Sequence, residues 1–446
     1  MAKVKSEQVR SLVSKEEEPY DVPQNWKWVY WGNAGQFIAG SGFPNSYQGF
    51  MEYEIPFFKV GNLKQADEHG YLYESENTVN DTMRVQMKAS LIPDHSILFA
   101  KIGEAIRLNR RSINVVPCCI DNNMMAFVPQ ICDMLYAYYW SLGIDLYQLT
   151  NATTVPAIRK SDLEVIPLPI PPLPEQQRIV DRIESLFAKL DEAKEKAQAV
   201  VDGFEDRKAA ILHKAFTGEL TAEWRKDNGV SLSSWTYEKI GEFAKVRGGK
   251  RLPKGYSLQN EKTEHPYIRI ADLGENTVDL ANIQYISDEV YRQISRYIIE
   301  DSDVYISIVG TIGKSGTIPA VLNGANLTEN AARISTARTL PRYLASFLNS
   351  PAEQEDIQGR IRSATLGKLS LYNINDITVP LPSKDEQQVV VDQIDKLFAL
   401  ENSAKNTAEQ VISQIETMKK AILARAFRGE LGTNDPSEPP ADIGIS

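Results

Sequence analysis

The sequence is poor in cysteine and histidine, the residues that build disulfide frameworks and many metal sites. Its 446 residues include 3 cysteines and 4 histidines. The cysteines are too few and wrongly spaced for a disulfide framework or a zinc site. No two histidines stand at metal-ligand spacing. These absences exclude a disulfide-rich scaffold and predict no metal site on this chain.

Long apolar runs are also missing, and none is long enough to span a membrane. The first residues carry Lys3, Lys5 and the acidic run Glu16-Glu17-Glu18, without the apolar core of a signal peptide. We therefore expect a cytoplasmic protein in a reducing compartment. The net charge of −10 argues against non-specific nucleic-acid binding. A whole-chain charge can nevertheless hide local basic patches.

Catalytic motifs are absent as well. The most tempting segment is Gly310-Thr311-Ile312-Gly313-Lys314-Ser315, which follows an expected strand. A phosphate-binding P-loop needs four residues between its glycines, and here there are two. The segment therefore predicts a strand that ends in a tight glycine turn. The chain also lacks the Asn/Asp-Pro-Pro-aromatic motif of amino-methyltransferases and a Gly-x-Gly-x-x-Gly after a strand. No catalytic residue is predicted.

The chain does contain one long stretch twice, at residues 173–220 and 384–431. A constant shift in numbering places Glu175-Gln176-Gln177 on Glu386-Gln387-Gln388 and keeps the whole stretch aligned without a gap. Both copies follow a proline-rich lead-in and end at Gly-Glu-Leu, which are typical boundaries of a helix. An internal repeat of this length predicts a duplicated architecture.

Each copy has the four-three apolar spacing of a helix that pairs with another helix. The apolar residues at this spacing form a seam along each helix. The main interruption is Arg207 in the first seam and Glu401 in the second. Since the globular segment between the copies begins near the end of the first helix, the short chain path returns antiparallel. We therefore predict an antiparallel coiled coil. Its predicted seam residues are Ile183, Leu186, Leu190, Phe204, Ile211, Ile394, Leu397, Val411, Ile415 and Ile422.

The globular parts are duplicated too. The segment GSGFPNSY at Gly40 aligns with GKRLPKGY at Gly249, and the run from Ile55 aligns with the run from His265. Short β-branched and aromatic runs between Gly, Pro and Asp predict strands. Outside these matches the two halves diverge. The sequence thus predicts an α+β fold, with two homologous α/β domains separated by the two long helices in a pseudo-two-fold internal repeat.

Clusters of basic and polar residues give the best binding signal. Glycines prevent a helix around Gly249, so the cations there are expected on a loop that approaches a phosphate backbone. The matching loop at Gly40 carries neutral polar residues, as two readers of different base sequences would need. A single cluster is also compatible with ordinary surface charge. The candidate DNA-binding residues are Lys245, Arg247, Lys250, Arg251, Lys254, Tyr256, Ser41, Asn45, Tyr47, Arg107, Arg110, Arg111, Arg360 and Arg362.

These features resemble the specificity subunits of Type I restriction–modification systems. The resemblance is carried by LPEQQRIVDRIESLF at residues 173–187 with DEQQVVVDQIDKLF at 385–398, and by AILHKAFTGELT at 210–221 with AILARAFRGELG at 421–432. It covers about residues 20–432. In that family each globular half is a target-recognition domain, and the repeated helices form the spacer on which modification subunits dock.

The resemblance implies a division of the chain into six parts. After an N-terminal leader come a recognition domain, a spacer, a second recognition domain, a second spacer and a proline-rich tail that we expect to be disordered. Their residues are 1–21 for the leader, 22–165 for target-recognition domain 1, 166–230 for the central spacer, 231–376 for target-recognition domain 2, 377–432 for the C-terminal spacer and 433–446 for the tail.

The resemblance also implies partners and a function. A non-catalytic subunit of this kind binds double-stranded DNA and reads an asymmetric bipartite target, one half per domain. Two modification subunits would carry S-adenosylmethionine for adenine methylation. Restriction subunits would carry ATP and Mg for cleavage, so no cofactor is expected on this chain. Two alternatives stay open: a coiled-coil scaffold with two protein-binding modules, and a self-contained enzyme using the Gly310 turn.

Overall fold

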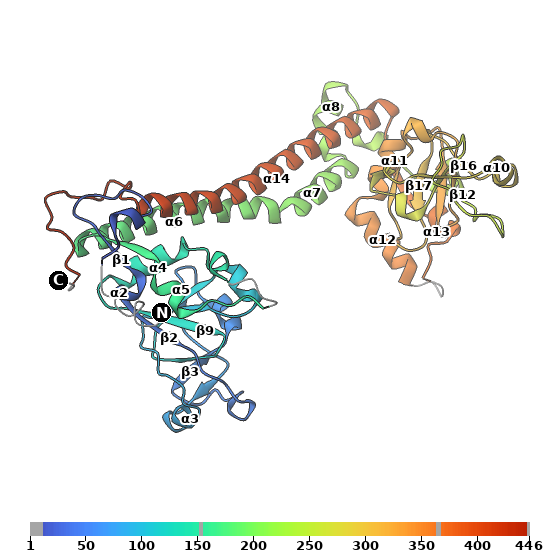
Figure 1. The fold of residues 1–446 in the computed structure, drawn as a ribbon. Helices are drawn as coiled ribbons and strands as arrows, with labels where there is room; N and C mark the ends of the chain where they lie inside the picture. The colour runs from blue at the N-terminus through green and yellow to red at the C-terminus, as the bar shows by residue number, and fades with distance from the viewer. Residues whose placement is uncertain (1–11, 151–154, 363–366, 444–446) are drawn as a thin grey trace. The chain divides into compact units, whose positions relative to one another are not determined.

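The computed structural model describes residues 12–150, 155–362 and 367–443. The chain divides into two compact units. Unit one comprises Met1–Lys196 and Val411–Ser446, and unit two comprises Ala197–Gln410. Each unit contains short strands, short helices and portions of the long helices, so the α+β class and the two-domain arrangement agree with the sequence (Figure 1). Within the described ranges, no helix is long and apolar enough to cross a membrane.

Unit one is built on a mixed sheet with the strand order β2-β9-β6-β7-β4, beside a smaller sheet with the order β5-β3-β8. Trp31 lies fully buried at the centre of its core, against Phe37, Phe127 and Trp140. The strands are β1 (Lys27–Tyr30), β2 (Gly35–Ala39), β3 (Ile55–Phe58), β4 (Tyr71–Leu72), β5 (Thr78–Val79), β6 (Ile97–Ala100), β7 (Arg111–Asn114), β8 (Cys119–Ile120), β9 (Met124–Pro129) and β10 (Pro167–Ile170). The α-helices of its globular part are α2 (Trp31–Ala34), α3 (Asp81–Gln86), α4 (Met134–Leu142) and α5 (Lys160–Glu164).

Unit two repeats the order of the main sheet with β12-β20-β17-β18-β14. Its second sheet, β15-β13-β19-β16, matches β5-β3-β8 in its first three strands and adds β16 at the edge. Its strands are β11 (Thr236–Lys239), β12 (Lys245–Gly248), β13 (Pro266–Ile268), β14 (Asn276–Thr277), β15 (Gln284–Tyr285), β16 (Ile298–Ile299), β17 (Val304–Ser307), β18 (Ser315–Thr317), β19 (Ala325–Leu327), β20 (Ala331–Ser335) and β21 (Thr378–Leu381). Its globular helices are α9 (Ile240–Phe243), α10 (Asp288–Ile294), α11 (Pro341–Leu348), α12 (Pro351–Arg362) and α13 (Leu371–Asn375). The sequence duplication is therefore a duplication of the fold.

The repeated Glu-Gln pair attaches a long helix to its globular domain. In unit one the Trp26 indole donates to the buried Glu175 carboxylate over 2.8 Å. The amide of Gln176 accepts from the Asp133 N–H at 2.7 Å and donates to the Pro171 carbonyl at 2.9 Å. A buried carboxylate and a buried amide need such partners.

Unit two repeats these contacts at the matching positions. Trp235 donates to Glu386 over 2.9 Å. Gln387 accepts from the Leu340 N–H at 2.8 Å and donates to the Pro382 carbonyl at 3.0 Å. The Glu-Gln repeat is therefore a structural joint, a role that the sequence pattern alone did not reveal.

Two long helical segments correspond to the repeated stretches. The first is α6 (Leu173–Asp202), followed after Gly203 by α7 (Phe204–Phe216), and the second is the continuous α14 (Lys384–Ala426). The expected single first helix is thus interrupted. The interruption is slight, because the Gly203 N–H still donates to the Ala199 carbonyl and its own carbonyl accepts from the Arg207 N–H, both at 3.1 Å.

Within each unit the long helices run antiparallel. In unit one, Lys194 pairs with Glu416 at 2.7 Å and Asp191 pairs with Lys419. Residues earlier in α6 therefore pair with residues later in α14, as antiparallel helices require. In unit two, the Phe204 ring lies 4.7 Å from the Lys405 ammonium, and the Phe398 ring lies 5.5 Å from that of Lys208. Figure 1 shows α14 beside α6 and α7. This direction agrees with the sequence prediction, whereas coiled-coil packing remains a prediction.

The predicted seam residues differ in burial. Ile183, Phe204, Ile394 and Ile415 are buried. The other six are half-buried: Leu186, Leu190, Ile211, Leu397, Val411 and Ile422. The two predicted interruptions, Arg207 and Glu401, form an ion pair of 2.7 Å with each other. The apolar pattern therefore placed all ten residues on faces that are at least half covered.

The expectation of a disordered tail is wrong for residues 433–443. Asn434 donates to the Glu175 carboxylate at 2.8 Å, and Glu438 accepts two hydrogen bonds from Arg178. Ala441 and Ile443 are each only 3% exposed and belong to the core of unit one. Composition predicted disorder because the tail is polar and proline-rich, but a few side chains find partners on α6 and near Trp26. Residues 444–446 lie outside the described ranges.

Candidate nucleic-acid interface

The two candidate recognition loops leave their sheets in the same way. After β2, the Gly40 N–H donates to the Met124 carbonyl and the Ser41 N–H to the Ile120 carbonyl. After β12, the Gly249 N–H donates to the Ala331 carbonyl and the Lys250 N–H to the Leu327 carbonyl. The backbone of each loop is therefore fixed at its start by the neighbouring strands.

Both loops begin with glycine because no side chain fits there. A Cβ on Gly40 would lie 1.8 Å from the Asp121 carbonyl oxygen. A Cβ on Gly249 would lie 2.1 Å from the Thr328 carbonyl oxygen. Both distances are far inside van der Waals contact, so the close backbone approach requires glycine at both positions.

A tyrosine ties each loop to a short helix. In unit one the Tyr47 hydroxyl donates to the Gln86 side chain of α3 at 2.9 Å. In unit two the Tyr256 hydroxyl bonds to Glu289 of α10. Within unit one, α3 lies at the end remote from α6, and within unit two, α10 lies on the side remote from α7 (Figure 1). Tyr47 and Tyr256 therefore hold the loops in place, which leaves the other polar side chains for a ligand.

The loop of unit two is strongly basic. Lys245 and Arg247 are exposed and, being two residues apart on β12, share one face of the sheet. Lys250 is exposed, with its ammonium 5.6 Å from the Tyr297 ring centroid. Lys254 is also exposed. Arg251 is 79% exposed but pairs with Glu329 at 2.7 Å, so its charge is partly compensated.

The loop of unit one offers neutral groups instead. Asn45 is exposed and Ser41 is half-buried, with its hydroxyl 3.5 Å from the Lys88 carbonyl. These groups both donate and accept hydrogen bonds, whereas the lysines and arginines of unit two only donate. The same loop position therefore presents different chemistry in the two units.

The second predicted cluster is dispersed by the fold. Arg111 is 4% exposed, and its guanidinium donates to the carbonyls of Asn109, Ser141 and Ile144. Burial lowers its pKa to about 9. Its prediction as a DNA contact is wrong, because those carbonyls and the core already surround it. Arg110 is exposed.

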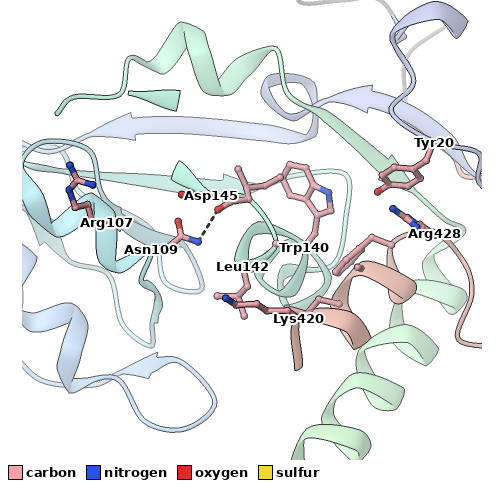
Figure 2. A pocket seen from close by; sticks show the side chains of 13 residues that line it. Tyr20, Arg107, Asn109, Trp140, Leu142, Asp145, Lys420 and Arg428 are labelled. Atoms are coloured by element: carbon pink, nitrogen blue, oxygen red, sulfur yellow. Dashed lines mark hydrogen bonds between the residues drawn. The ribbon is translucent and has the colours of Figure 1, made fainter. Parts of the chain in front are cut away.

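Arg107 faces a different cavity, of about 560 Å³, beside the end of α14 in unit one. Figure 2 shows Arg107, Trp140, Lys420 and Arg428 around it. The Asn109 side chain donates to the Ile144 carbonyl at 3.0 Å. The Arg107 guanidinium stacks on the Tyr147 ring at 3.7 Å and pairs with Glu104. Ser41, Asn45 and Tyr47 do not line this cavity, so Arg107 and the loop at Gly40 do not share it.

In the third cluster, acidic neighbours compensate the charge of Arg360. Arg360 forms ion pairs with Asp356 and with Asp376, the latter at 3.0 Å. Arg362 ends α12, and its side chain lies outside the described part. Both residues remain candidate contacts, but two carboxylates already compensate the charge of Arg360.

Two further arginines, which formed no cluster in the sequence, lie near the basic loop. Arg296 and Arg333 line, together with Arg247, a hollow of about 320 Å³ in unit two. They come from the segment after α10 and from β20, far from residues 245–256 in the chain. Only the folded sheet brings them together, so local sequence clustering could not find them.

The Gly310 segment connects two antiparallel strands. β17 ends at Ser307 and pairs with β18, which begins at Ser315. The Gly313 N–H donates to the Ser307 carbonyl at 2.9 Å, and both glycines have positive φ, 79° and 94°. A P-loop leads instead from a strand into a helix that caps phosphates. The predicted tight glycine turn is confirmed.

The fold and these loops define a class of protein: a duplicated scaffold whose two units share one strand order and carry chemically different loops. The family model described as "Type I restriction modification DNA specificity domain" matches residues 25–201 and again residues 233–414. The chain therefore belongs to the Type I restriction–modification DNA specificity family, as its resemblance indicated.

Individual relatives share this description. The chain is 28% identical over 312 residues to the Type I restriction enzyme EcoBI specificity subunit of Escherichia coli, a match that covers 65% of this chain and 64% of that subunit. It is 20% identical over 443 residues to the MjaVIII specificity subunit of Methanocaldococcus jannaschii, with 94% and 95% covered. The match to the EcoBI subunit thus spans slightly less than two thirds of that relative.

Solved structures share the fold. The HsdS subunit from Thermoanaerobacter tengcongensis superposes with a TM-score of 0.64 at 17% identity, covering 93% of this chain and 100% of that chain. A second solved chain comes from work on the complex assembly and conformational transition of the type I R-M system. It superposes with a TM-score of 0.66, also at 17% identity. At this level of identity the similarity concerns the fold.

Proposed function

We propose that this chain is the DNA specificity subunit of a Type I restriction–modification complex. Each recognition domain reads one half of an asymmetric, bipartite DNA target. The single observation that carries the proposal is the pair of loops after Gly40 and Gly249, which have the same backbone anchoring and different polar side chains. A shared scaffold with different donors and acceptors is what reading two unlike half-sites requires.

The long helices are proposed to set the gap between the half-sites as an antiparallel coiled coil. Dyad-related readers usually contact half-sites about one helical turn apart, ~34 Å. The reversed ion pairs of α6 with α14, and of Arg207 with Glu401, support this pairing. The proposed domain boundaries are 22–165 and 231–376 for the readers, and 166–230 and 377–432 for the spacers.

The same helices are proposed to dock two modification subunits. Apolar side chains on α14 stay in solvent, including Leu400 at 58% and Met418 at 48% exposure. Exposed apolar groups on an otherwise polar helix are typical of protein-binding surfaces. The catalytic steps are assigned to partners: methylation with S-adenosylmethionine to the modification subunits, and ATP- and Mg-dependent cleavage to restriction subunits. The proposed location is the cytoplasm.

The test is an exchange of one reader. Residues 231–376 are replaced by the corresponding domain of another specificity subunit, and the chimera is expressed with its modification subunits. Sequencing of methylated bases across the genome should reveal a target with one new half-site and one unchanged half-site, at the same gap. The matched control exchanges residues 22–165 and should change the other half-site.

Two results would count against the proposal. A chimera that changes both half-sites would contradict independent reading by the two domains. Methylation or cleavage of DNA by the purified chain alone would contradict the assignment of catalysis to partners, and an ATP-binding assay on the same sample tests the self-contained-enzyme alternative.

A further inference from the structure

The hollow of about 320 Å³ in unit two collects three guanidinium groups. Arg247 reaches it from β12, Arg333 from β20, and Arg296 from the segment that follows α10. Tyr297, Gly248 and Gly249 also line it. The hollow thus lies at the base of the basic loop that starts at Gly249.

The three arginines differ in how they are held. Arg333 is only 15% exposed, and its guanidinium bonds to the Ile298 carbonyl and to Asp303, the latter at 3.4 Å. Arg247 and Arg296 are exposed, and among the described residues no ion pair or side-chain hydrogen bond holds either of them. One fixed cation and two adjustable ones therefore surround the same space.

Their arrangement is unfavourable without an anion. Arg247 and Arg333 are direct cross-strand neighbours in the pairing of β12 with β20. Like charges directly opposite each other destabilise a sheet. Asp303 compensates one guanidinium, which leaves a net positive charge at the hollow. A bound anion would offset the remaining repulsion.

Unit one lacks all three arginines. At the register of Arg247 and Arg333, the pairing of β2 with β9 places Ile38 opposite Ala126. Ala89 occupies the position in unit one that corresponds to Arg296. Each stands three residues before an isoleucine in matching strand pairing, Ile92 with Cys118 in unit one and Ile299 with Ala325 in unit two. The scaffold itself therefore does not need these cations, and a ligand explains them better than folding does.

We infer that this hollow binds a backbone phosphate of the DNA half-site read by unit two, and that Arg247 and Arg296 are its contacts. The inference rests on the proposed function and adds a site that unit one does not share. Guanidinium groups offer only donors, in a planar fork that matches phosphate oxygens. Arg333, held by Asp303 and a carbonyl, shapes the site as a positioning residue.

The test measures DNA binding by the chain assembled with its modification subunits. Fluorescence anisotropy is recorded with a duplex that contains the methylation target and with a scrambled duplex, between about 50 and 200 mM salt. Arg247→Ala and Arg296→Ala should each weaken binding to both duplexes by a similar factor, roughly fivefold to tenfold. Each should also reduce the salt slope by about 1. Arg296→Lys keeps the charge and should retain the slope.

The matched control is Arg292→Ala, which removes an exposed arginine of α10 that does not line the hollow. It should change the slope less than Arg296→Ala. Thermal melting checks that all variants fold. Arg296→Ala should leave the melting temperature unchanged because Arg296 is exposed, and Arg247→Ala should not lower it because the change relieves the repulsion from Arg333.

The outcomes separate the two proposals. If the unaltered complex shows no salt-dependent binding to either duplex, the proposed function itself fails. If it binds but both alanine variants keep the full slope, the phosphate site is refuted and the proposed function stands. If the variants change the methylated sequence instead of weakening binding uniformly, the arginines contact bases, which also overturns the phosphate assignment.

Discussion

The two units share one scaffold and differ where that scaffold is exposed. Their main sheets have corresponding strand orders, and both loops start at a glycine pressed against a carbonyl oxygen. In unit one the neighbouring positions carry Ser41, Asn45 and the apolar Ile38. In unit two they carry lysines and arginines. Buried backbone contacts fix the fold, so surface residues of a duplicated domain are free to diverge toward different ligands.

The buried joints differ in a second way. Glu386 is fully buried beside Arg225, at 2.6 Å, and also accepts from Thr221 and Trp235. Glu175 has the neutral Asn434 and Trp26 instead, and one of its carboxylate oxygens has no partner among the described residues. Burial raises the pKa of Glu175. The same motif is thus satisfied by an ion pair in unit two and by amide and indole hydrogen bonds in unit one.

The largest effect is expected from Arg225→Ala. The substitution leaves the Glu386 carboxylate buried without its cation, which costs about 3–5 kcal/mol of unfolding free energy. Hydrogen exchange of the amides in β11 and β21, read by mass spectrometry, should report this loss in unit two. Adding Glu386→Gln should restore part of it, because the neutral amide no longer needs a cation.

Asn434→Ala is the matched change in unit one. It removes one hydrogen bond from Glu175 and should cost less, about 1–3 kcal/mol, measured by exchange in β1 and β10. An equal loss for both variants would mean that the charge of Arg225 contributes nothing beyond a hydrogen bond, and the contrast between the joints would fail.

A pH-dependent effect is expected at Glu353 of α12. This residue is 8% exposed, and one of its carboxyl oxygens has no partner among the described residues. The corresponding position of unit one holds Leu146, which follows Tyr136 by the same number of residues as Glu353 follows Tyr343. Burial, with a contribution from Asp356, raises the pKa of Glu353 from 4.5 to about 8. Between these values the folded state binds the proton and the unfolded state has released it. Stability of unit two should therefore fall as pH rises through this window, by up to about 1.4 kcal/mol per pH unit.

Glu353→Gln removes this titration. Exchange of α12 amides, corrected for intrinsic rates at each pH, should show a flatter pH dependence in the variant than in the unaltered chain. An identical dependence in both proteins would show that the Glu353 carboxyl titrates at its ordinary pKa and that its burial is relieved in solution.

Much of the architecture was readable from the sequence because duplication leaves two copies to compare. The helix repeat that aligns Glu175 with Glu386, together with the separate match of Gly40 with Gly249, predicted two homologous domains. Four-three spacing predicted which helix residues are covered. The loops at Gly40 and Gly249 were visible for the same reason. Their chemistry differs while their backbone requirements coincide.

The remaining features depend on contacts between residues distant in the chain. Arg111 resembled Arg107 and Arg110 in sequence, but β7 turns it into the core, where carbonyls surround it. Arg296 and Arg333 meet Arg247 only across the sheet. Disorder of the tail was predicted from its composition. Composition contains no information on the hydrogen bond that Asn434 donates to the buried Glu175 carboxylate. Local patterns report periodicity and turn chemistry, and they do not report which side chains the fold brings together.

The smallest expected effect concerns the pair that interrupts both predicted seams. Arg207 and Glu401 are 38% and 22% exposed, so their coupling should be about 0.2–1 kcal/mol and should weaken at high salt. A double-mutant cycle of Arg207→Ala and Glu401→Ala, with exchange of α7 amides as the readout, measures it. Lys194 with Glu416 in unit one, at 41% and 58% exposure, is the matched and more solvated pair. The Arg207 guanidinium also donates to the Val200 carbonyl, so both a carbonyl and the Glu401 carboxylate hold it in place. The coupling of Arg207 with Glu401 should therefore exceed that of Lys194 with Glu416. Equal couplings would mean that the two interruptions are ordinary surface charges and that the seam gains no register from them.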